Sequence, residues 1–69
     1  MNKIIYLCKS QFNNQEFKLA IFKNCPSNKY MIVNLTSYSF WNFKFNSYKG
    51  AERRIYMNKN WQIKKIGEE

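Results

Sequence analysis

The chain has 69 residues, with 12 Lys and Arg against 4 Asp and Glu, a formal net charge of +8 and no histidine. A chain of this length forms one domain and buries only roughly 60% of its unfolded surface, which excludes a large enzyme with a deep cleft. Because aspartate is absent as well, the usual general bases and metal ligands are scarce. We therefore expect a non-enzymatic binding protein with no cofactor and no metal.

Aromatic residues make up 19% of the chain and apolar residues 45%, which indicates a packed core rather than a disordered segment. Cys8 and Cys25 lack the paired spacings of a zinc site. No secretion signal is evident, because only the short apolar run Ile4 to Cys8 follows the first residues. We expect free thiols in a reducing cytoplasm, with a disulfide as the alternative. No apolar run approaches the ~20 residues of a membrane span.

The first part of the chain predicts four strands, because short runs there alternate or are rich in β-branched and aromatic residues. These runs are residues 3–9, 16–23, 29–35 and 40–45. Turns are expected between them at Gln11–Gln15 with Asn13-Asn14, at Cys25-Pro26-Ser27-Asn28 and at residues 36–39. Connections of hairpin length predict an antiparallel meander.

The spacing of apolar residues then changes to that of a helix. Ser47 is a suitable N-cap, and Tyr48, Ala51 and Ile55 follow at helical spacing. Asn58 or Asn60 is expected to end the helix, and Gly50 weakens it by up to ~1 kcal/mol. Residues 61–66 alternate and predict a last strand.

The predicted fold class is therefore α+β, in the order β-β-β-β-α-β. We expect a single small domain over residues 1–69, in which an antiparallel sheet of four or five strands is packed on one face by one short helix.

Positive charge is concentrated in residues 44–65, where Glu52 is the single acid. This segment holds seven of the 12 cations: Lys44, Lys49, Arg53, Arg54, Lys59, Lys64 and Lys65. Such a surface attracts polyanions, and its contacts with phosphates give a salt-dependent affinity. Arg53 and Arg54 are the first residues to test, because a guanidinium binds phosphate in a bidentate manner. The alternative is that the charge serves only solubility.

Aromatic residues are interleaved with these cations, an arrangement typical of proteins that stack single-stranded nucleic acid in a basic groove. Five apolar residues are expected to pack in the core: Trp41, Phe43, Phe45, Trp61 and Ile63. Three aromatic residues are expected to be exposed, as candidates for base stacking or for a protein contact: Tyr38, Phe40 and Tyr56. The partner is expected to be nucleic acid or a nucleotide-like anion.

Other interpretations remain open at this stage. A nuclease without histidine would need Glu16 or Glu52 as its base, within a constellation that a sequence does not reveal. A basic cytoplasmic domain could instead bind an acidic protein or a host nucleoprotein complex. A sheet edge such as Ile4–Leu7 or Ile63–Ile66 could pair with a second copy, so a homodimer is a further alternative.

The C-terminal part of the chain carries the pattern Phe43-x-Phe45-x-Ser47-x-x-x-Ala51-x-x-x-Ile55, followed by Trp61-x-Ile63. It resembles a strand–helix–strand unit of small phage and mobile-element proteins, and it is similar to the DNA-binding arms of tyrosine integrases. Those arms present their sheet to DNA, whereas here the polar face of the sheet offers only Lys18, Lys44 and Lys64 and the helix is more basic.

The size, basicity and aromatic content of the chain, together with its lack of catalytic residues, are also similar to those of phage anti-CRISPR and other anti-defence proteins. That resemblance implies stoichiometric inhibition of a host protein or nucleoprotein complex. It does not imply mimicry of DNA, because DNA mimics are acidic and this chain carries a charge of +8.

Overall fold

The computed structural model describes residues 3–24 and 27–68, and its elements follow one another in the predicted order. Their bounds are β1 Lys3–Ser10, β2 Glu16–Asn24, β3 Lys29–Asn34, β4 Ser39–Phe45, α1 Tyr48–Tyr56 and β5 Trp61–Glu68. The expected strands are confirmed with small differences at their ends. Cys25 and Pro26, which belong to the second predicted turn, lie outside the described residues.

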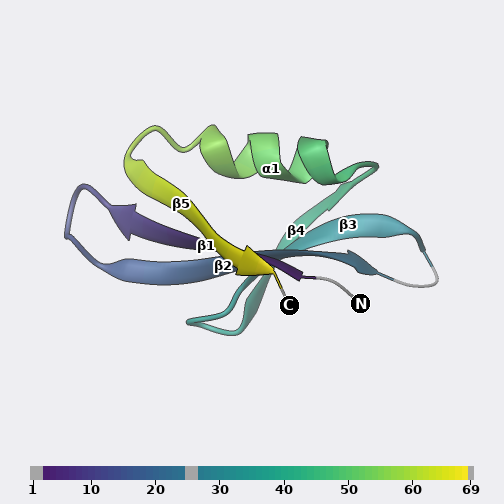
Figure 1. Cartoon of the computed structure of the whole chain (residues 1–69), viewed down its shortest axis with the longest axis horizontal. Helices are drawn as coiled ribbons and strands as arrows, with labels where there is room; N and C mark the ends of the chain where they lie inside the picture. The colour runs from purple at the N-terminus through teal and green to yellow at the C-terminus, as the bar shows by residue number, and fades with distance from the viewer. Residues whose placement is uncertain (1–2, 25–26, 69) are drawn as a thin grey trace.

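The strands form one antiparallel sheet in the order β4-β3-β2-β1-β5 (Figure 1). Consecutive strands from β1 to β4 are neighbours, as the predicted meander requires, and β5 returns from the helix to pair with β1. Because β1 lies between β2 and β5, the expectation that Ile4–Leu7 forms a free edge is wrong. Ile63–Ile66 does lie on an edge strand.

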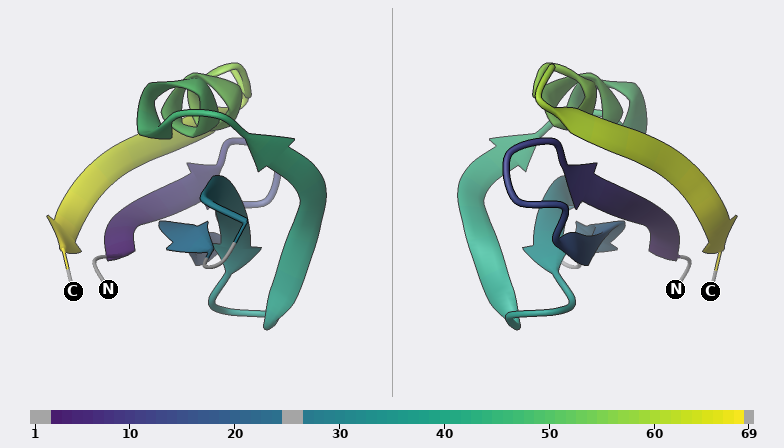
Figure 2. Two further views of the ribbon diagram at one scale, coloured as in Figure 1. Left: turned by 90° about the vertical axis from the view of Figure 1, so that its right-hand side faces the viewer. Right: turned by 90° about the vertical axis from the view of Figure 1, so that its left-hand side faces the viewer.

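The helix α1 lies over one face of the sheet (Figures 1 and 2). Ala51 and Ile55 are its buried residues, and Tyr48 packs against the same core, which confirms the predicted helical stripe. Beneath them the core takes every second side chain of β1, β2 and β3: Tyr6, Cys8, Leu19, Ile21 and Ile32. None of the described elements covers the opposite face of the sheet, which we call the open face.

Aromatic side chains surround this core. Trp61 contacts the rings of Phe17 and Trp41 edge-on, with centroids 4.9 and 6.2 Å away. Because Trp41 and Trp61 stand on the two opposite edge strands, the sheet must curl toward the helix side to bring them together. Phe45 and Ile63 also pack against the core as predicted. Phe43 does not: it is 49% exposed, with the side chain of Arg54 over its ring and the ring of Phe45 beside it.

The predicted ends of α1 are confirmed by side-chain hydrogen bonds. The Ser47 hydroxyl accepts a bond from the backbone N–H of Gly50 at 3.1 Å, which satisfies a helix N–H that would otherwise lack a partner. At the other end, the Asn58 side-chain amide donates to the carbonyl oxygen of Ile55 at 3.0 Å. The helix is therefore held to nine residues by its own sequence.

Left-handed backbone conformations occur in the hairpin connections, at Asn14, Asn28 and Tyr38. Asparagine tolerates this conformation, so the Asn13-Asn14 turn forms as predicted. A tyrosine with φ of 58° is unusual, because its Cβ crowds the following carbonyl group. The Tyr38 side chain is also 84% exposed, so little packing compensates for this local strain.

Cys8 is a free thiol in the core beneath α1, and its burial raises the pKa of the thiol to about 11. A thiol held neutral in this way is a poor nucleophile near neutral pH. Cys8 therefore serves as a small packing residue, while Cys25 lies outside the described residues.

Candidate nucleic-acid interface

Seven cations were predicted to form the polyanion-binding surface, and five of them lie on the side of the sheet that carries α1. We call them the helix-side basic surface: Lys49, Arg53, Arg54, Lys59 and Lys65. Three of them come from the helix, one from the turn that follows it, and one from β5. The helix thus brings together cations that span 17 positions of the sequence, from Lys49 to Lys65.

Arg54 is held against aromatic side chains of the edge strand β4. Its guanidinium carbon lies 5.1 Å from the centre of the Phe43 ring and 6.0 Å from that of Trp41. Cation–π attraction favours this arrangement, by ~0.5–1 kcal/mol at exposed sites. Arg53, the preceding residue, is exposed on the helix. One arginine is therefore positioned over aromatic rings while its neighbour is free to reach a ligand.

Both arginines also lie in the last turn of α1. Positive side chains at this end interact favourably with the partial negative charge of the helix terminus, by typically 0.3–1 kcal/mol each. Arg53 and Arg54 therefore contribute to the helix as well as to the surface. A substitution at either position needs a measurement of folding beside any measurement of binding.

The single acid of this surface, Glu52, faces two tyrosine hydroxyls. The Tyr6 hydroxyl donates to Glu52 Oε2 at 2.5 Å and the Tyr48 hydroxyl donates to the same oxygen at 2.8 Å. The two hydroxyl oxygens also lie next to each other, and because each hydroxyl carries one proton, at most two of the three contacts are hydrogen bonds at any moment. These bonds hold the pKa of Glu52 below its usual range, with smaller contributions from Lys65 and Lys49. Glu52 is thus ionised and engaged by the hydroxyls.

The same cluster affects the tyrosines. Burial, and then the bond to Glu52, raises the pKa of Tyr6. Burial also raises the pKa of Tyr48, whose ring lies 5.9 Å from the Lys65 ammonium. Both hydroxyls therefore stay protonated and act as donors. The cluster links β1 to the start of α1.

Lys44 and Lys64 do not belong to this surface. Lys44 lies opposite Met31 and Lys64 lies opposite Leu7, so both side chains are on the open face. The reason is the two-residue period of a strand, which places Lys64 and Lys65 on opposite faces of β5. The prediction that all seven cations form one surface is therefore wrong.

The three aromatic candidates are exposed as predicted but lie apart from one another. Phe40 is on the open face, opposite Val33, and Tyr38 is in the turn between β3 and β4. Tyr56 alone lies on the helix side, where its ring meets that of Tyr6 edge-on at 6.1 Å. The aromatic residues next to the arginines are Trp41 and Phe43, which sequence reasoning assigned to the core. Their alternation along β4 indicated the correct face, but not that a short helix would leave Phe43 exposed.

The remaining chemistry of the described residues is sparse. Residues 3–24 and 27–68 contain no group of three or more Cys, Asp or Glu side chains that could hold a metal ion. Glu16 lies on the open face of the sheet, in line with Lys18, whereas Glu52 lies on the helix side, so the two interior acids do not form a pair. Within the same residues, no helix has both the length and the apolar character needed to cross a membrane.

Comparisons with known proteins found no relative of the chain. No protein-family model matches the chain, and no match was found among curated proteins or among solved structures.

Proposed function

We propose that the protein is a non-enzymatic binding protein that engages nucleic acid through the helix-side basic surface. One observation carries the proposal: the Arg54 guanidinium lies over Phe43 and Trp41, with the exposed cation Arg53 beside it. Phosphates need cations and bases need flat apolar faces, and this surface offers both side by side. A nucleotide-like anion is the smallest ligand with the same chemistry.

Single strands fit this surface better than duplexes. Bases of a single strand are free to stack on an exposed ring, whereas the bases of a duplex are already stacked on one another. Phe43 is 49% exposed and lies on an edge strand, where a base can approach it. A helix of nine residues is ~13 Å long, enough to follow two or three phosphates of an extended strand.

The engagement of Glu52 supports this proposal. Glu52 is the single acid between residues 17 and 67, and both of its hydrogen bonds come from tyrosine hydroxyls. It therefore does not hold Arg53 or Arg54 in an ion pair that a phosphate would have to replace. We place the interaction in the cytoplasm, where nucleic acid is accessible and a thiol such as Cys8 stays reduced.

The test is a salt titration with fluorescently labelled oligonucleotides, followed by anisotropy. If four or five cations contact phosphates, the logarithm of the affinity should fall with the logarithm of salt with a slope of about −3. This slope corresponds to a loss of about 200-fold between ~50 and ~300 mM salt. Single-stranded DNA and RNA should bind more tightly than duplexes of the same length. No detectable binding of any of them at ~50 mM salt would refute the proposal.

The structure offers a matched control. Arg53→Glu with Arg54→Glu, and Lys44→Glu with Lys64→Glu, change the net charge by the same amount on opposite faces of the sheet. The arginine pair should abolish binding and the lysine pair should weaken it only slightly. Equal losses would show that net charge, rather than the helix-side basic surface, drives binding. Circular dichroism of both variants identifies any loss of folding.

A further inference from the structure

The open face of the sheet carries a continuous apolar row that crosses four strands. Strand register places Ile5 opposite Ala20, Ala20 opposite Val33, and Val33 opposite Phe40. Ile5 and Val33 are 7% and 8% exposed although none of the described elements covers this face, because flanking side chains shield them. Phe40 at the end of the row is 60% exposed and meets the Phe22 ring edge-on.

Lysines stand on both sides of this apolar row. On one side the register aligns Lys3 with Phe22, Phe22 with Met31, and Met31 with Lys44. On the other side Leu7 lies between its two partners, Lys18 and Lys64. On β1, β2 and β3, neighbouring rows on one face are ~6.6 Å apart, because each is two residues further along the strand. On β4 an irregularity sets Phe40 and Lys44 four residues apart. The two lysine rows are therefore roughly 13 Å apart, with apolar side chains between them.

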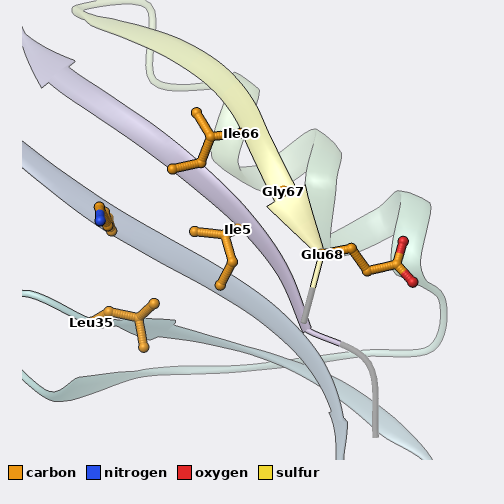
Figure 3. Close-up of a pocket in the computed structure, with 6 residues that line it drawn as sticks. Ile5, Leu35, Ile66, Gly67 and Glu68 are labelled. Carbon is orange, nitrogen blue, oxygen red and sulfur yellow. The ribbon is translucent and has the colours of Figure 1, made fainter.

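Shallow hollows open onto the apolar surface. One of about 280 Å³ is lined by Ile5, Leu35 and Ile66 (Figure 3), and Lys18, Gly67 and Glu68 also line it. Figure 3 shows that the Glu68 carboxylate points away from the three apolar side chains. A second hollow of about 300 Å³ is lined by Lys3, Phe22, Val33, Leu35 and Phe40. Each hollow combines apolar walls with at least one lysine, which suits an apolar side chain flanked by an acid.

We propose that the open face is a docking site for an acidic amphipathic helix of a partner protein. In this arrangement the apolar stripe of the partner helix packs on the side chains that stay accessible along the row, Phe22, Leu35 and Phe40, and acids on its two flanks meet the lysine rows. A helix with side chains is ~10–12 Å wide, which matches the spacing between those rows. The proposal does not depend on the helix-side basic surface, which lies on the other face of the sheet.

Other occupants fit the charges less well. A second copy of the chain would bring lysine rows against lysine rows, and like charges placed face to face are unfavourable. A nucleic acid strand would place its phosphates over the apolar row or lie along only one lysine row. Two acids lie near these rows in strand register, Glu16 opposite Lys9 and Glu68 opposite Ile4, and each reduces the positive charge at one end only. An acidic amphipathic helix satisfies the apolar row and both lysine rows at once.

A titration of the full chain, followed by methyl and amide NMR, tests this proposal. The probe is a synthetic 18-residue helical peptide with leucines at i, i+3, i+4 and i+7 and glutamates on both flanks. A peptide of the same composition in scrambled order is the control. We expect saturable shifts of the methyl groups of Ile5, Leu7, Val33 and Leu35, and at least tenfold weaker binding of the scrambled peptide.

Variants separate this site from the helix side. Lys44→Glu with Lys64→Glu should lower the affinity for the peptide at least tenfold, because the charge of one lysine is reversed on each side of the apolar row. Arg53→Glu with Arg54→Glu should leave peptide affinity within about twofold. Equal affinity for the two peptides, shifts confined to α1, or an unliganded dimer whose interface covers the open face would each overturn the proposal. So would binding to vesicles of anionic phospholipid that competes with the peptide.

Discussion

The hydrogen bonds from Tyr6 and Tyr48 to Glu52 give a quantitative test of what holds α1 onto the sheet. Glu52→Gln keeps an acceptor oxygen where Oε2 receives bonds of 2.5 and 2.8 Å, but removes its charge. A hydrogen bond to a charged group contributes ~1.5–3 kcal/mol, roughly twice as much as a neutral one. If each of the two bonds loses about half of its contribution, the free energy of unfolding falls by ~1.5–3 kcal/mol. For a domain of this size that lowers Tm by roughly 6–24 °C.

The assay is urea unfolding followed by circular dichroism, with Tyr48→Phe and the double variant completing a cycle. Because the two residues share a bond, the double variant should be destabilised by ~0.5–1.5 kcal/mol less than the sum of the single variants. Additive effects, or a Glu52→Gln effect below ~0.5 kcal/mol, would show that the charge does not stabilise these bonds.

The pH dependence of unfolding tests whether the negative charge of Glu52 is the source of this stabilisation. The fold holds the pKa of Glu52 below its usual range, so the carboxylate stabilises the fold above its unfolded pKa. That contribution is lost as the pH falls through the lowered, folded pKa. The stabilities of the native chain and of Glu52→Gln should therefore converge in acid. A difference that stays constant from pH 7 to pH 2 would contradict the charge-based explanation.

Three further predictions concern stability. Tyr38→Asn should raise the free energy of unfolding by about 0.5–1 kcal/mol, because asparagine tolerates a φ of 58° better, and it should leave oligonucleotide affinity unchanged in the anisotropy assay. Ser47→Ala should lower the free energy of unfolding by ~1 kcal/mol in urea unfolding, since the hydrogen bond to the Gly50 N–H is lost. Above pH ~9, the Cys8 thiol should lower the free energy of unfolding by up to ~1.4 kcal/mol per pH unit. The reason is that the thiol ionises in the unfolded chain, while burial holds its pKa in the folded chain at about 11. Cys8→Ala should reduce that slope, and an unchanged slope would exclude the thiol as its source.

Local patterns were sufficient to predict the elements of this fold. Alternation in residues 16–23 and 40–45, the Asn13-Asn14 turn and the Ser47 cap are properties of neighbouring residues, and each corresponds to an observed strand, turn or helix end. The position of β5 beside β1 could not be predicted in this way. It depends on where the chain travels after α1, which is decided by packing rather than by local sequence.

The functional surface was predicted less well for a related reason. Alternation shows that Lys64 and Lys65 point to opposite sides, but it does not say which side α1 covers. The cluster of Tyr6 and Glu52 joins residues 46 positions apart and has no local signature. The contact of Arg54 with Phe43 likewise depends on how far a short helix extends over an edge strand. Such contacts become visible only when the elements are assembled.

Solubility alone is the simplest explanation of the charge, and the distribution of side chains offers a way to reject it. The two arginines of the chain are adjacent on α1, and lysines flank an apolar row on the open face. A charge that serves only solubility requires neither arrangement, and charge reversal on either face should then leave both ligands unaffected. General electrostatic attraction predicts that both double variants weaken oligonucleotide and peptide binding equally. Only two separate sites predict that each variant weakens one ligand and spares the other, so the crossed result distinguishes all three explanations.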